Sequence, residues 1–247
     1  MIKLQRSLPP DRLSEDFVHA KTEEYKQTKK SVWNIDWLKK SLMELSYGKC
    51  AYCECYLSKE SNYVEVDHFE DKNHNEDKVM LWENLLPSCK HCNVHKSDHD
   101  VIAEPIVNPF VDDPKNHLYL QYYRYKPKDK KGTTTIDVLQ LNNGERNMVS
   151  TRFELGNKLQ ELILDNNEKF EKYSKKSSVI NRNKLVGSVN AMLKLCQPDS
   201  EYSATCATVL QLCPEYSILK SSMTNAGLWS LEMEKMDVKS RELCLFK

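Results

Sequence analysis

The chain has 247 residues, of which 40% are hydrophobic, and its 36 lysines and arginines balance its 36 aspartates and glutamates. This length is sufficient for one large or two small domains with a buried core, and the balanced charge argues against a protein that holds nucleic acid by bulk charge alone. Any contact with a phosphate backbone must therefore be local or supplied by a partner. The polar start and the lack of a long apolar run predict a cytoplasmic protein without a signal peptide or membrane span.

Two helices are expected before the first cysteine pair. The segment from about Ser14 to Gln27 has an amphipathic helical pattern. The next segment has apolar residues at helical spacing, with Asn34 as the predicted N-cap and Gly48 as the residue that stops the helix. A helix end therefore leads directly into Cys50.

A strand, a loop and a helix are predicted around the cysteine pairs. The segment from Asn62 to Val66 alternates and is β-branched, which suits a short strand with Asp67 and His68 at its end. Residues from Asn93 to His99 lack glycine and proline and are expected to begin a helix.

Strands and then helices are predicted in the second half. The segments His117–Tyr125 and Thr133–Leu139 have strand composition and are expected to form a hairpin through the basic turn Lys126–Gly132. Apolar residues return at helical spacing from about Asn147 to Tyr173 and from Val179 to Leu195. The C-terminal part is therefore expected to be mainly helical.

Four of the nine cysteines form two C-x-x-C pairs, Cys50 with Cys53 and Cys89 with Cys92. In a cytosolic chain this spacing favours thiolate ligands over disulfides, and Zn²⁺ prefers four such ligands in a tetrahedron. We predict a structural zinc knot with these ligands, and Cys55 is a less favoured substitute. The alternative is a set of buried reduced thiols without metal, although matched pairs rarely arise by chance. The remaining cysteines are expected to be core or surface thiols: Cys196, Cys206, Cys213 and Cys244.

The order of motifs from the first cysteine pair to Lys96 resembles the HNH endonuclease family. The order is C-x-x-C, then Val66-Asp67-His68, then Trp82-Glu83-Asn84-Leu85, then C-x-x-C-N-x-x-K. The resemblance implies a ββα-metal module that hydrolyses phosphodiester bonds with one divalent metal at the leaving 3′ oxygen. It also implies that His68 is the general base and that Asn84 braces the loop that carries it.

The residue types support this chemistry. An imidazole with a pKa of about 6.5 can take a proton from water at neutral pH. Mg²⁺, or Mn²⁺ in its place, prefers oxygen ligands such as the Asp67 carboxylate and the Asn93 carbonyl. Successive strand side chains point to opposite faces, so Asp67 and His68 can both face the metal only across a bend. We expect Asp67 and Asn93 to bind the metal and His68 to face the scissile phosphate.

Two further ideas remain open from the sequence. His95 or His91 is an alternative ligand for the catalytic metal, because some HNH enzymes have a histidine after the last cysteine. Lys96 is expected either to contact phosphate or to lie on a solvated helix face.

The expected fold class is α+β, with a ββα-metal HNH module and its four-cysteine zinc knot embedded in a mainly helical body. Residues 1–46 would form an N-terminal helical segment and residues 47–105 the zinc module. Residues 106–247 would form a β-hairpin followed by a helical region.

The segments outside the module are similar to the HNH subunit of Septu-type antiphage systems, including retron-associated relatives. The similarity lies in Leu8–Pro10, Lys49–Glu54, Asn108–Pro114 and Thr133–Asn142. It implies a partner, an ABC-type ATPase of the PtuA kind, which senses infection and controls the nuclease. The neutral net charge is consistent with a nuclease held in such a complex.

The sequence therefore predicts a metal-dependent HNH endonuclease that cleaves DNA within an antiphage complex. RNA such as tRNA is an alternative substrate, because a site that grips the phosphate backbone reads little of the sugar. A non-catalytic zinc-stabilised subunit that binds nucleic acid or the partner is the second alternative. The pair Asp67 and Asn93 argues against it, since a binding ribbon needs the cysteines but not these oxygen ligands.

Overall fold

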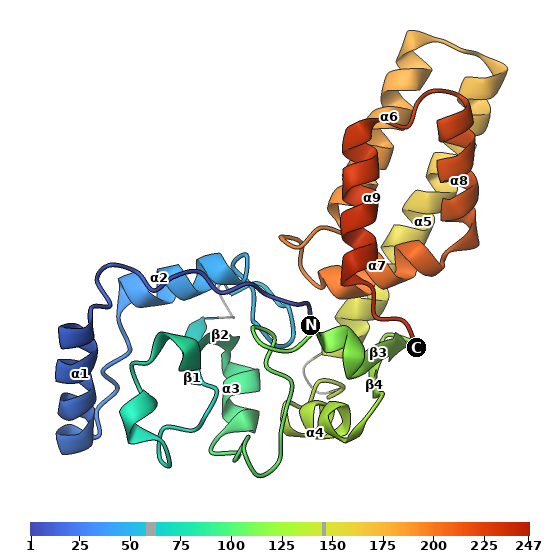
Figure 1. Cartoon of the computed structure of the whole chain (residues 1–247). Coiled ribbons are helices and arrows are strands. Elements are labelled where there is room, and N and C mark those ends of the chain that lie inside the picture. The colour runs from blue at the N-terminus through green and yellow to red at the C-terminus, as the bar shows by residue number, and fades with distance from the viewer. Residues whose placement is uncertain (58–62, 145–146) are drawn as a thin grey trace. The chain divides into compact units, whose positions relative to one another are not determined.

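The computed structural model describes residues 1–57, 63–144 and 147–247 (Figure 1). These residues form two compact units. The first contains Met1–Leu118 and Lys126–Leu141, and the second contains Tyr119–Tyr125 and Asn142–Lys247. The division of the chain into three sequence segments stays a prediction.

The first unit begins with two helices, α1 (Glu15–Thr28) and α2 (Asp36–Leu45). The Ser14 hydroxyl accepts a hydrogen bond from the Phe17 amide and caps α1, which confirms the first predicted helix. The prediction that Asn34 caps α2 is wrong, because Ile35 is the N-cap and none of the described side chains caps this end. Asp36 instead stands in the first turn, where a negative charge is favourable to the helix dipole.

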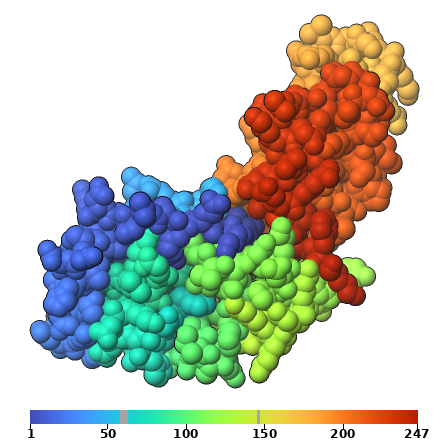
Figure 2. Space-filling view, in the orientation of Figure 1, coloured from blue at the N-terminus to red at the C-terminus, as the bar shows by residue number. Residues whose placement is uncertain are grey.

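A small antiparallel sheet follows, formed by β1 (Val64–His68) and β2 (Leu85–Cys89). The connection contains two short 3₁₀ helices, η1 (Glu76–Lys78) and η2 (Trp82–Asn84). Helix α3 (Lys90–Lys96) begins directly after β2. In the space-filling view the blue N-terminal helices lie directly against the teal segment that carries η1, and α1 packs on η1 (Figure 2).

The predicted strand before Asp67 is confirmed from Val64 onward, whereas Asn62 lies outside the described residues. The helix expected from Asn93 starts earlier, at Lys90. Cys89 ends the strand in extended conformation and is the N-cap of α3, so the second cysteine pair itself forms the start of the helix.

The core of the first unit lies between α2 and the sheet, since α2 packs against both β1 and β2. Leu38 and Leu42 of α2 are fully buried there with Leu85 of β2. Burying one such side chain contributes roughly 1.5–3 kcal/mol, so these contacts hold the sheet against the N-terminal helices.

The hairpin predicted across the basic turn is wrong. The strands are β3 (Leu118–Gln121) and β4 (Arg124–Pro127), which are joined at Tyr122 and Tyr123, and the next element is the helix α4 (Lys130–Val138). The 3₁₀ helix η3 (Pro114–Asn116) precedes them.

A local hydrogen bond explains why the threonine-rich segment is helical. The Asp129 carboxylate accepts a 2.7 Å hydrogen bond from the Gly132 amide and caps α4. The Thr135 hydroxyl donates to the Lys131 carbonyl and accepts from the Val107 amide. Capping and tertiary contacts therefore override the strand preference of the threonines.

Apart from the strand residues within Tyr119–Tyr125, the second unit is mainly helical, with α5 (Met148–Lys175), α6 (Val179–Lys194), α7 (Ser203–Leu212), α8 (Pro214–Asn225) and α9 (Leu231–Leu243). The structure confirms the two predicted long helices, α5 and α6, to within a few residues. Helix α5 packs against α6, α7 and α8, while α9 packs on α6 and α7.

The described residues thus form a mixed, helix-dominated protein with small two-stranded sheets, as the α+β expectation requires. Among the helices described, none combines the length and the apolar character needed to cross a membrane.

Candidate zinc site and active site

The two cysteine pairs meet in the interior of the first unit. The Sγ atoms of Cys50, Cys53, Cys89 and Cys92 all lie within 4.8 Å of one another, and all of these residues are buried. Zn–S bonds of about 2.3 Å in a tetrahedron place sulfurs about 3.8 Å apart. The observed Cys53–Cys89 separation of 3.7 Å fits that value, so the group could bind zinc.

The backbone around the first pair forms a compact turn. The Cys50 amide donates to the Cys55 carbonyl at 2.9 Å, and the Glu54 amide donates to the Cys50 carbonyl at 3.1 Å. The Ala51 amide donates to Pro87 of β2, which ties this turn to the sheet. The Cys55 sulfur lies 3.5 Å from that of Cys53 but is not part of the four-thiol group.

The Asp67 side chain of β1 is buried, and two other side chains hold its carboxylate in place. The Tyr52 hydroxyl donates to Oδ2 at 2.5 Å and the Lys96 ammonium donates to Oδ1 at 3.2 Å. Tyr52, Lys96 and Asp67 are each at most 2% exposed. Lys96 also donates to the His68 carbonyl at 2.6 Å, so the expectation that Lys96 contacts phosphate or solvent is wrong.

His68 lies on the other face of β1, since regular pairing with β2 continues through His68 and no bend precedes it. Its Nε2 is 3.0 Å from the Val79 carbonyl oxygen. A carbonyl only accepts, so Nε2 carries the proton, and Nδ1 of the neutral ring is an acceptor with no hydrogen-bond partner among the described residues. Burial lowers the pKa of His68 to about 4, and the hydrogen bond to Val79 opposes this shift. The imidazole is therefore neutral at pH 7.

Trp33 was not foreseen from the sequence. Its ring packs edge-on against His68 with centroids 4.4 Å apart, and it contributes to the burial of the imidazole. Trp33 lies between α1 and α2. Its only signal in the sequence is that it is an aromatic residue just before a predicted helix.

Asn84 ties together the segments that flank His68. Its Oδ1 accepts from the Glu70 amide at 2.7 Å, and its Nδ2 donates to the carbonyls of Glu70 and Lys78 at 3.0 and 3.2 Å. Lys78 directly precedes Val79, whose carbonyl accepts the hydrogen bond from His68. Asn84 thus connects the chain just after His68 with the chain at its hydrogen-bond partner.

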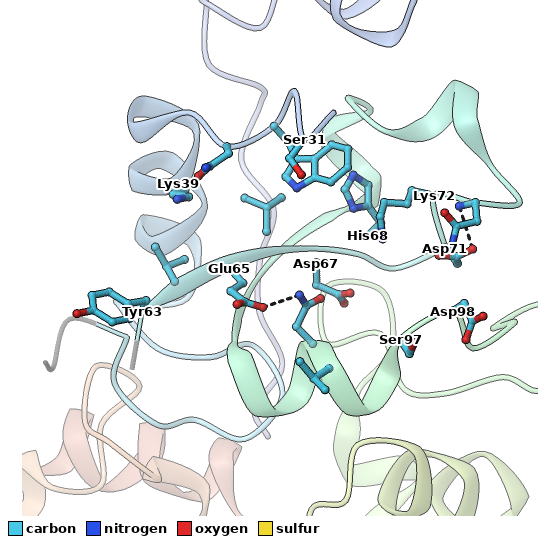
Figure 3. A pocket seen from close by; sticks show the side chains of 17 residues that line it. Ser31, Lys39, Tyr63, Glu65, Asp67, His68, Asp71, Lys72, Ser97 and Asp98 are labelled. Atoms are coloured by element: carbon cyan, nitrogen blue, oxygen red, sulfur yellow. Dashed lines mark hydrogen bonds between the residues drawn. The ribbon is translucent and has the colours of Figure 1, made fainter. Parts of the chain in front are cut away.

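Asn93 lies on α3 and faces β1. Its Nδ2 donates to Oε2 of Glu65 at 2.6 Å. Glu65 and Asp67 stand two residues apart on the strand, and Figure 3 shows both extending from the same side of β1 toward α3, with His68 on the opposite side.

Asp67, His68 and Asn93 line one open pocket of about 710 Å³. His91 and His95 are not among the described residues that line it. Nδ1 of His95 instead donates to the His91 carbonyl at 2.8 Å, and the two rings lie 4.0 Å apart. The pocket therefore gathers the predicted base with the two predicted oxygen ligands, but not the alternative histidine ligands.

The donor set of this pocket fits a hard divalent cation. The Asp67 carboxylate and the Asn93 amide oxygen are ligands that Mg²⁺ and Mn²⁺ prefer. Each Asp67 oxygen accepts one hydrogen bond and has a second lone pair, so the carboxylate retains capacity to bind a metal.

No family model matches the chain. It is 41% identical over 238 residues to the Septu protein PtuB of Bacillus thuringiensis, an alignment that covers 96% of this chain and 92% of that protein. It is 28% identical over 190 residues to the Septu protein PtuB of Bacillus mycoides strain KBAB4, covering 59% of this chain and 64% of that protein.

Proposed function

The chain belongs to the family of the Septu protein PtuB, and from this premise we propose that it is a metal-dependent HNH endonuclease that hydrolyses phosphodiester bonds of DNA in an antiphage defence complex. One observation carries the proposal most directly: Asp67, His68 and Asn93 line a single pocket, and the neutral imidazole of His68 keeps Nδ1 to accept a proton because Nε2 donates to Val79. A protein that only binds needs no such acceptor beside oxygen ligands.

His68 would act as the general base. Its Nδ1 accepts a proton from the attacking water, while the Val79 carbonyl keeps the second nitrogen protonated and the ring in one orientation. The low pKa of about 4 keeps the imidazole neutral before the reaction. Asn84 would position this base through its hydrogen bonds to the backbone of Glu70, just after His68, and of Lys78, next to the hydrogen-bond partner Val79.

Asp67 and Asn93 would hold Mg²⁺ or Mn²⁺. When bound, the ion supplies positive charge that stabilises the leaving 3′ oxygen. Tyr52 and Lys96 orient Asp67, and Glu65 contacts Asn93. The antiparallel pair β1–β2 followed directly by α3 supports the proposal of a ββα-metal module.

A structural zinc ion in the four-cysteine group would hold the first cysteine turn against β2 and α3. The proposed partner is an ABC-type ATPase of the PtuA kind that restrains the nuclease. The net charge of zero supports such an arrangement, because a nuclease placed on its substrate by a complex needs no large basic face of its own.

The proposal is tested by comparing the wild-type protein with His68→Ala. Each is incubated with Mg²⁺ or Mn²⁺ and supercoiled plasmid, single-stranded DNA or tRNA, with and without the co-expressed ATPase. Cleavage of DNA that the variant loses, with unchanged zinc content, supports the proposal. Cleavage of tRNA alone would change the substrate to RNA. Wild type and variant that are equally inert in every reaction would favour the non-catalytic binding subunit.

A further inference from the structure

The hydrogen bond between Asn93 and Glu65 decides which atom of the amide faces the metal pocket. An ionised carboxylate has no proton to donate, so the amide atom 2.6 Å from Oε2 of Glu65 must be Nδ2. The amide oxygen is then the atom left available for a cation. The oxygen and nitrogen ends of an amide group are nearly alike in shape. The negative charge of Glu65 is what distinguishes them at Asn93.

The charges around Asp67 make Glu65 well suited to this task. The Asp67 carboxylate is neutralised by the buried Lys96 ammonium. Glu65 forms no ion pair among the described residues, and its carboxylate lines the same pocket. Glu65 therefore remains a full negative acceptor for the Asn93 amide, and charge-assisted hydrogen bonds of this kind are roughly twice as strong as neutral ones.

We infer that Glu65 is a positioning residue for the proposed catalytic cation: it holds the Asn93 side chain so that the amide oxygen, and not the nitrogen, is presented beside Asp67. This inference rests on the proposed function for the identity of the site. It adds a residue that acts on the metal through Asn93 rather than by direct ligation. The sequence pattern of the module contains no indication of this role.

The test is Mn²⁺ binding, measured by electron paramagnetic resonance on the zinc-loaded full chain. Five variants are compared with the wild type. Three of them are Glu65→Gln, Asn93→Asp and the double variant that combines these two substitutions. The other two are controls, Asp98→Asn alone and Asp98→Asn combined with Asn93→Asp. Asp98 lines the same pocket but has no hydrogen bond to Asn93. Thermal unfolding is measured for each variant to verify that it is folded.

Glu65→Gln is expected to raise the Mn²⁺ dissociation constant about 10-fold, because a neutral amide no longer selects one orientation of Asn93. In the Asn93→Asp background both terminal atoms are oxygens, so there is no orientation to select and Glu65 only repels the new carboxylate. There Glu65→Gln is expected to leave binding unchanged or to tighten it. Asp98→Asn is expected to have a smaller effect that is the same in both backgrounds.

An equal loss of Mn²⁺ affinity from Glu65→Gln in both backgrounds would overturn the inference, since it would mean direct ligation or a general charge effect. An unchanged affinity for Glu65→Gln, or no Mn²⁺ binding by the wild type, would also overturn it. Cleavage is measured separately with His68→Ala. Loss of the proposed nuclease function with the expected Mn²⁺ pattern intact would refute only the catalysis, so the two failures are distinguishable.

Discussion

The Tyr52 hydroxyl donates a 2.5 Å hydrogen bond to Oδ2 of Asp67, and this bond links the first cysteine turn to the strand that carries the proposed metal ligand. Lys96, four residues beyond Cys92, contacts the other oxygen of the same carboxylate. The turn with the first cysteine pair and the helix that begins at the second pair thus each provide one side chain that orients Asp67. These two buried hydrogen bonds therefore link the four-cysteine group to the proposed catalytic site.

Tyr52→Phe removes one hydrogen bond from a buried carboxylate. We expect a loss of about 1–3 kcal/mol in the free energy of unfolding, together with weaker cleavage, because Asp67 loses its orientation. Urea unfolding and the cleavage assay measure the two effects. The matched control is Tyr122→Phe, which alters a tyrosine that is 85% exposed and should change neither quantity. Equal behaviour of the two variants would contradict the role of Tyr52.

Removing one zinc ligand should disorganise the first unit. Cys50→Ser is expected to lose the zinc, about one ion per chain in the wild type, and to unfold at lower temperature, since structural zinc sites contribute directly to folding. Metal content by atomic emission spectrometry and thermal unfolding are the measurements. Cys55→Ser is the control, because Cys55 lies outside the four-thiol group and should retain the metal. Zinc loss in the Cys55 variant would show that the ligand set is different.

Lys96→Met leaves the buried Asp67 carboxylate without its cationic partner. We expect a loss of about 3–5 kcal/mol in stability, the usual cost of breaking a buried ion pair. The double variant with Asp67→Asn should lose less than the two single variants together, because the uncompensated charge is gone. A double-mutant cycle in urea measures the coupling energy. Strict additivity would mean that the two residues do not interact in solution.

Asp237 of α9 should make the second unit sensitive to acid. Its carboxylate is fully buried, and burial alone would raise its pKa, but hydrogen bonds from Lys220, Tyr216 and Gln211 outweigh burial and hold the pKa below its usual value. Because the folded pKa lies below the unfolded value of about 3.9, the stabilisation is fully present above that pH. It is lost as the pH falls through the folded pKa.

Asp237→Asn is therefore expected to lower stability at pH 7 by about 1–3 kcal/mol and to reduce the decline in stability between roughly pH 5 and pH 3. Thermal unfolding over this pH range is the measurement. Asp165→Asn is the control, because its i,i+4 ion pair with Lys169 is half-exposed and contributes little. A decline as steep in the Asp237 variant as in the wild type would assign the acid sensitivity to other groups.

The sequence alone was sufficient for the features that depend on local spacing. The C-x-x-C pairs predicted which four thiols lie together, and helical periodicity located α1, α5 and α6. Strand alternation placed Asp67 and His68 on opposite faces of β1. These features follow from the period of the backbone and the preference of Zn²⁺ for soft ligands, both of which are visible in the order of residues.

Only the tertiary structure decided which side chains meet across elements. Four contacts depend on how α2 and α3 pack on the sheet: those of Trp33 with His68, of Tyr52 and of Lys96 with Asp67, and of Glu65 with Asn93. The helix at Lys130–Val138 likewise depends on the Asp129 cap and on the contact between Thr135 and Val107. Such pairings are set by strand register and by packing between segments far apart in the chain. Local conformational propensities therefore do not predict them.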